Sequence, residues 1–211
     1  KNGAKVIINY SNSEDEANKT VDVIIKNGGT ALAIKANVSQ KDQVTHLFDK
    51  TIESFGKVDV LINNAGIMNN KLLKDHTQED FSKLFNVNVR GVFNTLQEAN
   101  SKLADNGIII NFSSSTTKLM LPQYALYSST KAAVEQMTRV FSKEIGRGIS
   151  VNAIAPGATA TELFTTGKSQ ETIDELSSMS AFNRIAEPID IAKVVLFLAS
   201  DDSKWISGQV V

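Results

Sequence analysis

Tyr127 and Lys131, four residues apart, are the side chains of this sequence best suited to acid–base chemistry. Residues at this spacing lie on one face of a helix, so the phenol and the ammonium would be neighbours. A nearby positive charge favours the phenolate, and we expect Lys131 to lower the pKa of Tyr127 from its usual value of about 10 towards neutrality. Such a tyrosine could give a proton to a carbonyl oxygen, or take one from an alcohol, near pH 7.

A third side chain, Ser114, stands thirteen residues before Tyr127 in a run of hydroxyl residues at 113–117. Its hydroxyl could donate a hydrogen bond to a substrate oxygen on which charge develops. The alternative for each residue is structural, because a half-buried tyrosine, a solvated lysine and a polar loop use the same residue types. The elements around these residues must decide between the two interpretations.

The composition is that of a globular protein. The 211 residues are 42% hydrophobic and 21% charged, ordinary values for a chain that buries a sizeable core. A net charge of -1 gives no long-range attraction to nucleic acid, and no apolar run approaches the length of a membrane span. The absence of cysteine excludes disulfides and thiolate metal sites. We therefore expect a cytoplasmic protein with no metal and no nucleic-acid or membrane partner, in which the isolated His46 and His76 are solvated.

Short apolar runs alternate along the chain with helical patterns. The expected strands are residues 5–10, 30–36, 58–62, 107–112 and 149–155. The expected helices are residues 14–27, 39–55, 78–103, 122–145 and 188–199, with a short further strand at 208–211. Ser13 to Glu16 form a capping-box pattern at the start of the first helix. This alternation predicts an α/β fold with a parallel sheet covered by helices on both faces.

Polar or small residues follow each of the five longer expected strands. In parallel sheets ligands collect beyond the carboxyl ends of the strands, where these residues would meet. They are Tyr10-Ser11, Asn37-Val38, Asn64-Ala65-Gly66, Ser113-Ser114 and Pro156-Gly157. Their common position favours a binding site that includes Ser114 and Tyr127.

With these residues in place, the chain closely resembles the short-chain dehydrogenase/reductase family. The matching motifs are Asn63 to Gly66 after a strand, Asn88 in the stretch 86–91, Ser114, Tyr127 with Lys131, Pro156-Gly157 with Thr161, Arg184, and residues 188–192. They occur in the family's order and at its intervals over essentially the whole chain. The resemblance implies an NAD(P)-dependent enzyme made of one Rossmann-type doubly wound domain, residues 1–211.

The resemblance also implies a role for each catalytic residue. Tyr127 would exchange the proton, and Lys131 would hold the ribose hydroxyls of the cofactor. Ser114, which the thirteen-residue interval selects from its neighbours, would bind the substrate oxygen. Asn88 would support a water relay to Lys131, although an asparagine inside a helix could also merely cap or pack there.

The residues expected to bind the cofactor lie mainly at the strand ends. They are Tyr10, Ser11, Asn37, Val38, Asn64, Ala65, Gly66, Tyr127, Lys131, Pro156, Gly157, Thr159 and Thr161. Small residues among them let the backbone approach a ribose closely. Thr159 replaces the apolar β-branched residue common in the family, but its backbone and the Thr161 hydroxyl would still meet the nicotinamide carboxamide.

The end of the first strand favours NADP(H) over NAD(H). An NAD site usually has a carboxylate there for the ribose 2′-hydroxyl, and residues 9–12 contain none. Hydroxyl and amide donors are available instead for a 2′-phosphate. We assign the acidic residues Glu14, Asp15 and Glu16 to the start of the following helix.

One motif of the family is absent. Its members begin with a strand and a glycine-rich turn, whose helix N-terminus receives the pyrophosphate. Here residues 1–4 resemble the end of that helix, and residues 209–211 resemble the start of the family's final strand. We therefore expect a longer protein trimmed at both ends, whose central strand, between residues 5–10 and 58–62, is missing.

The expected activity is reduction of a small aldehyde or ketone to an alcohol with NADP(H), because Tyr10-Ser11 and residues 180–186 resemble aldehyde-reductase-type members of the family. The alternatives are reduction of 3-oxoacyl thioesters such as 3-oxoacyl-ACP, oxidation of sugars or alcohols, and a cofactor-binding scaffold whose chemistry has lapsed. Ile67, Met68 and residues 119–121 could wall the substrate pocket, with residues 163–182 as its lid. The resemblance implies a homotetramer built through the helices at 78–104 and 122–145.

Overall fold

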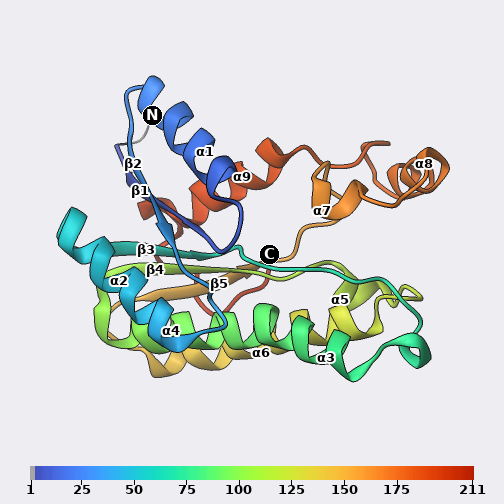
Figure 1. Ribbon diagram of the computed structural model, residues 1–211, viewed down its shortest axis with the longest axis horizontal. Coiled ribbons are helices and arrows are strands. Elements are labelled where there is room, and N and C mark those ends of the chain that lie inside the picture. Colours follow the sequence, from blue (N-terminus) through green and yellow to red (C-terminus); the bar gives the residue numbers. More distant parts are fainter. Residues whose placement is uncertain (1–2) are drawn as a thin grey trace.

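The computed structural model describes residues 3–211 as alternating strands and helices (Figure 1). The strands are β1 (Lys5–Tyr10), β2 (Thr30–Lys35), β3 (Val58–Asn63), β4 (Leu103–Phe112) and β5 (Ser150–Ile154). The helices are α1 (Glu14–Lys26), α2 (Lys41–Phe55), α3 (Gln78–Phe85), α4 (Gly91–Lys102), α5 (Thr116–Leu119), α6 (Ala125–Glu144), α7 (Glu162–Thr165), α8 (Gln170–Ser178) and α9 (Pro188–Leu198), with short turns at η1 (Leu73–Asp75) and η3 (Asp201–Ser203). Residues 1 and 2 of the segment expected to end a helix lie outside the described residues, and Gly3 and Ala4 are not helical.

All strand pairs are parallel, as predicted. β1 pairs with β2, and β3, β4 and β5 pair in that order. Within residues 3–211 no ladder joins β1 to β3, so the sheet consists of two parts (Figure 1). The break lies where a central strand was expected to be missing, and Val60 and Ile62 of β3 remain partly exposed.

Helices cover both faces of the three-stranded part of the sheet. The main core lies under α2, α4 and α6, and its buried members include Val44, Leu96, Ile109, Val134 and Val151 (Figure 1). A second core lies under α9 and consists of Ile108, Ile110, Ile154 and Leu198. Consecutive residues of β4 therefore alternate between the two cores, as the period of two in a strand requires. The doubly wound Rossmann-type fold predicted from the sequence is confirmed.

The helix predicted at 78–103 is interrupted. Asn86–Arg90 form a π-helical turn (η2) between α3 and α4, and β4 already begins at Leu103. Such turns are rare and occur frequently at functional sites. This one carries Asn88, whose side chain is buried.

Three smaller expectations differ from the structure. Ser13 makes no capping bond to α1 within the described residues, because its backbone (φ -97°, ψ 67°) departs from the extended geometry usual at this position. Residues 116–119, for which no helix or strand was expected, form α5. The short strand expected at 208–211 forms one parallel bridge, between Val210 and Ala153, although backbone hydrogen bonds join residues 208–211 to β5 and to Ala155 after it.

None of the helices within residues 3–211 combines the length and apolar character needed to cross a membrane. The same residues contain no group of three or more histidine, aspartate or glutamate side chains placed to hold a metal ion.

Candidate active site

One face of α6 carries three buried ionisable side chains at intervals of four residues: Tyr127, Lys131 and Glu135. Lys131 and Glu135 make hydrogen bonds to the segment 112–117, which contains the end of β4 and the loop after it, and the Tyr127 phenol lies close enough to Ser114 in this segment for that hydroxyl to affect its pKa. Ser114 belongs to this loop and reaches Tyr127. The fold thus brings Ser114, Tyr127 and Lys131 to the carboxyl edge of β4.

The prediction that Lys131 lowers the pKa of Tyr127 is wrong for this structure. Burial raises the pKa of the Tyr127 phenol, a hydrogen bond from Ser114 opposes this, and the neighbouring Tyr124 raises it further. The net pKa is above 10.0, because withdrawal from water disfavours the phenolate.

The Lys131 ammonium is directed elsewhere. Its Nζ donates a hydrogen bond to the carbonyl oxygen of Phe112 at 2.9 Å and lies 5.7 Å from the centre of the Tyr127 ring. Burial lowers the pKa of Lys131 from 10.5 to about 8. Burial therefore favours the neutral form of both side chains, the phenol of Tyr127 and the amine of Lys131.

The Ser114 hydroxyl is prepared to act as a donor. Its Oγ accepts hydrogen bonds from the backbone N and the Oγ1 of Thr116, at 3.3 and 3.1 Å. Because these bonds occupy the oxygen's acceptor positions, the hydroxyl hydrogen remains available for Tyr127 or for a substrate oxygen.

Asn88 holds the loop after β3 beside Lys131. Its Oδ1 accepts a hydrogen bond from Ile67 N at 2.8 Å, and its Nδ2 donates to Ile67 O and Thr130 Oγ1, at 2.9 and 3.0 Å. A Cβ placed on Gly66 would lie 3.4 Å from both Asn88 Oδ1 and Lys131 Nζ. The glycine therefore lets the backbone come close to both polar atoms. The role of Asn88 in a water relay stays a prediction.

The other predicted cofactor residues lie at the carboxyl ends of their strands. Tyr10 ends β1, Asn37 and Val38 follow β2, Asn64 to Gly66 follow β3, and Pro156 and Gly157 follow β5. Thr159 is held by a parallel bridge to Ala186, and Thr161 directly precedes α7.

Asn63, the first residue of the predicted turn motif, points into the protein instead. Its Nδ2 donates to Asn111 Oδ1 at 2.8 Å, and its Oδ1 accepts from Thr95 Oγ1 at 2.8 Å. Asn111 in turn donates to Thr138 on α6 at 2.8 Å. This buried chain of hydrogen bonds links α4, β3, β4 and α6. No local pattern in the sequence indicates it, because its members are far apart along the chain.

An acidic side chain lies nearer the end of β1 than predicted. Burial and a hydrogen bond to the Glu14 carboxylate raise the pKa of Tyr10. The assignment of Glu14 only to the start of the following helix is wrong, because Ser13 makes no side-chain capping bond within the described residues and Glu14 acts on Tyr10. The spacing of four between Tyr10 and Glu14 is the sequence signal that could have indicated this contact.

The two histidines differ in burial. His46 is exposed, as predicted, but the prediction of a solvated His76 is wrong because its side chain is only 4% exposed. Its Nδ1 lies 3.7 Å from Asp80 Oδ2, and neither ring nitrogen has a hydrogen-bond partner among residues 3–211.

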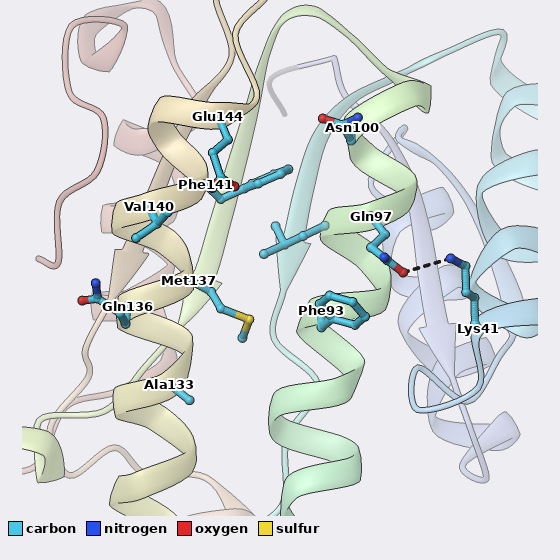
Figure 2. A pocket seen from close by; sticks show the side chains of 11 residues that line it. Lys41, Phe93, Gln97, Asn100, Ala133, Gln136, Met137, Val140, Phe141 and Glu144 are labelled. Atoms are coloured by element: carbon cyan, nitrogen blue, oxygen red, sulfur yellow. Dashed lines mark hydrogen bonds between the residues drawn. The ribbon is translucent and has the colours of Figure 1, made fainter.

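The residues proposed to wall a substrate pocket fall into two groups. Ile67 and Met68 pack against the buried cluster that contains Tyr127, whereas Leu119 and Met120 are exposed. The expected lid includes α7 and α8, which extend away from the sheet (Figure 1). A groove of about 810 Å³ lies between α4 and α6 (Figure 2), and neither Tyr127 nor the residues expected to wall the substrate pocket line it.

A parallel sheet with helices on both faces and polar residues at its carboxyl edge defines a Rossmann-type nucleotide-binding protein. The family model described as enoyl-(acyl carrier protein) reductase matches residues 1–211. A short chain dehydrogenase of Claviceps purpurea is 41% identical, over 99% of this chain and 84% of the relative. Versicolorin reductase stcU of Emericella nidulans is 40% identical, with coverage of 99% and 84%. The crystal structure of angucycline C-6 ketoreductase LanV with bound NADP is 36% identical, with a TM-score of 0.92 and coverage of 99% and 84%.

The chain belongs to the short-chain dehydrogenase/reductase family, as its motifs indicated. It is an NAD(P)-dependent oxidoreductase.

Proposed function

We propose that this protein reduces a ketone or aldehyde to an alcohol with NADP(H), and that Tyr127 is the proton donor. The observation that carries the proposal is the convergence of the Tyr127 and Ser114 hydroxyls in a buried site beside Lys131. The relatives support the direction of the reaction, since two of them are named a versicolorin reductase and a ketoreductase.

A carbonyl oxygen placed between the two hydroxyls would accept a hydrogen bond from each. Because burial raises the pKa of Tyr127, the phenol is protonated at neutral pH, which is the state that a proton donor needs. The Ser114 hydrogen stabilises the negative charge that develops on the oxygen before the proton arrives. When bound, NADPH supplies the hydride for the carbonyl carbon.

The residues around Lys131 fit the ribose of such a cofactor. A lysine ammonium has three donors, and within the described residues one of them is used on Phe112 O. The absence of a side chain at Gly66 keeps the approach to the others open. Lys131 would hold the ribose hydroxyls, and Asn88 would support the return of a proton through water. The remaining contacts would come from the strand ends and from Thr159 and Thr161.

We assign NADP(H) rather than NAD(H) because residues 9–12 carry hydroxyl and amide groups and no carboxylate. LanV was crystallised with NADP, which agrees with this assignment. Glu14, which raises the pKa of Tyr10, opposes it by placing one negative charge nearby.

The substrate is tested with a panel of ketones, aldehydes and 3-oxoacyl thioesters, each measured by the loss of NADPH or NADH absorbance. We expect ketones to be reduced, with NADPH preferred. A protein that reduces no member of the panel with either cofactor would refute the proposed reaction. A preference for NADH would refute only the cofactor assignment.

We also propose that the protein is a homotetramer assembled through α4 and α6. Phe93 of α4 and Met137 of α6 lie on either side of the groove between these helices (Figure 2), and Phe93 is 47% exposed. An apolar groove on this scale is typical of a surface that another protein covers. Analytical ultracentrifugation of the full natural protein should give a tetramer, and Phe93→Glu should dissociate it; a monomeric wild type contradicts the proposal.

A further inference from the structure

Glu135 is a buried carboxylate to which the proposed reaction assigns no step. It lies one helical turn beyond Lys131 on α6 and is 3% exposed. Its Oε1 accepts hydrogen bonds from Ser113 Oγ and Thr117 Oγ1, both at 2.8 Å, and its Oε2 accepts one from Arg139 Nη2 at 3.0 Å. A buried charge is tolerated only when it is partnered in this way.

The two hydroxyl partners of Glu135 flank Ser114 along the chain. Ser113 precedes Ser114, and Thr117 follows it by three residues, so a single carboxylate oxygen holds both sides of the Ser114 loop. The helix that carries Glu135 also carries Tyr127, two turns earlier. The contact at Glu135 therefore influences the separation of the Ser114 and Tyr127 hydroxyls.

The other bonds of this loop leave that separation less well fixed. The backbone N–H groups of Ser113 and Ser115 donate to Ile154 O and Pro156 O, at 2.7 and 3.0 Å, which ties the loop to β5 rather than to α6. The further bonds to α6 are those of Ser128 Oγ to Thr116 O at 3.2 Å, of Ser113 Oγ to Lys131 O at 3.5 Å and, just before the loop, of Lys131 Nζ to Phe112 O at 2.9 Å. The shorter pair of bonds at Glu135 is the stronger connection.

We propose that Glu135 is a positioning residue whose carboxylate clamps the loop 113–117 to α6 and thereby sets the geometry of Ser114 and Tyr127. The inference rests on the proposed role of these two hydroxyls. Burial raises the pKa of Glu135, but hydrogen bonds from Thr117, Ser113 and Arg139 outweigh it and lower the pKa overall. The clamp is therefore charged, and so at full strength, at neutral pH.

The test replaces the carboxylate in the full natural protein. Glu135→Leu removes both hydroxyl bonds and should lower kcat by at least about tenfold, since displacements of a fraction of an ångström in catalytic groups have effects of this order. KM for NADPH should stay within about twofold, because the cofactor contacts lie elsewhere. Glu135→Gln keeps an oxygen that can accept both bonds and should restore most of the activity.

Arg139→Gln is the matched control. It removes the partner on the solvent side, where the Arg139 side chain is 40% exposed, and leaves the two hydroxyl bonds intact, so kcat should stay near the wild-type value.

Thr117→Val is a second way to weaken the clamp, and it does not remove a buried charge. It should lower kcat in the same direction, and combining it with Glu135→Leu should add little, because both changes break one clamp. Wild-type kcat in folded Glu135→Leu overturns the positioning role, whereas a wild type without turnover refutes the proposed function instead.

A readout independent of turnover keeps the two failures separate. The chain has three tyrosines, so the ring signals of tyrosine labelled with carbon-13 can be assigned by substitution. We expect the Tyr127 signal to move in Glu135→Leu and to stay in place in Arg139→Gln. An unchanged Tyr127 signal in Glu135→Leu would refute the clamp, whether or not a substrate has been found.

Discussion

Replacing Asn88 with alanine should destabilise the protein by about 2–4 kcal/mol. Asn88 is 1% exposed, and its side chain satisfies both the N–H and the C=O of Ile67. Each backbone group left unpaired in the interior costs about 1–3 kcal/mol, and the lost side-chain volume adds to this. Thr130 loses one partner but still donates to Tyr127 O at 2.7 Å, so the damage centres on the loop after β3.

Urea unfolding of the full natural protein, with no cofactor added, measures this loss. Asn94→Ala is the matched control, because Asn94 is also a buried asparagine near the same helix start, but among residues 3–211 its side chain makes a single bond, to Val38 O at 2.8 Å. It should lose about 1–2 kcal/mol. If Asn88→Ala loses no more stability than Asn94→Ala, the two bonds to Ile67 do not hold the loop, and the reasoning fails.

Three further predictions concern the lysine and the cofactor side of the site. Burial lowers the pKa of Lys131 to about 8, so between this value and 10.5 the unfolded chain binds more protons than the folded one and stability should rise with pH. Urea unfolding across this pH range should show the rise in the wild type and not in Lys131→Met; the same slope in both would contradict it. Gly66→Ala should fold normally but raise the KM for NADPH, because the new methyl group would lie 3.4 Å from Lys131 Nζ and Asn88 Oδ1; an unchanged KM means that the cofactor does not approach there. Glu14→Gln removes the charge at Tyr10 and should tighten NADPH roughly threefold while leaving NADH unchanged, measured by cofactor fluorescence. Equal effects on both cofactors would place the 2′-phosphate elsewhere.

The fold was predictable because its signals are local. Consecutive isoleucines such as Ile108 and Ile109 enter opposite cores, which is why β4 reads as a continuous apolar run. The place of Ser114 at the carboxyl edge of the sheet followed from the general rule for parallel sheets, and its pairing with Tyr127 followed from the family resemblance. Neither inference needed any knowledge of long-range contacts.

The features that the sequence did not predict depend on partners far along the chain. The π-helical turn carries Asn88, whose partner Ile67 is 21 residues away. The spacing of four correctly predicted that Tyr127 and Lys131 share a helix face. It did not predict that Lys131 donates to Phe112 O, 19 residues away, or that burial is the largest influence on the pKa values of both side chains. The clamp at Glu135 repeats the same spacing of four after Lys131, and that repeat is the signal that could have revealed it.

The central claim is that Tyr127 donates the proton. Tyr124 offers a matched control, because its ring packs edge-on against that of Tyr127 with their centres 6.4 Å apart. With a ketone substrate and NADPH, the full natural protein carrying Tyr127→Phe should lose at least about a hundredfold in kcat while binding NADPH nearly as well as the wild type. Tyr124→Phe should keep most of its activity. Turnover of Tyr127→Phe within a few-fold of the wild type would contradict the account.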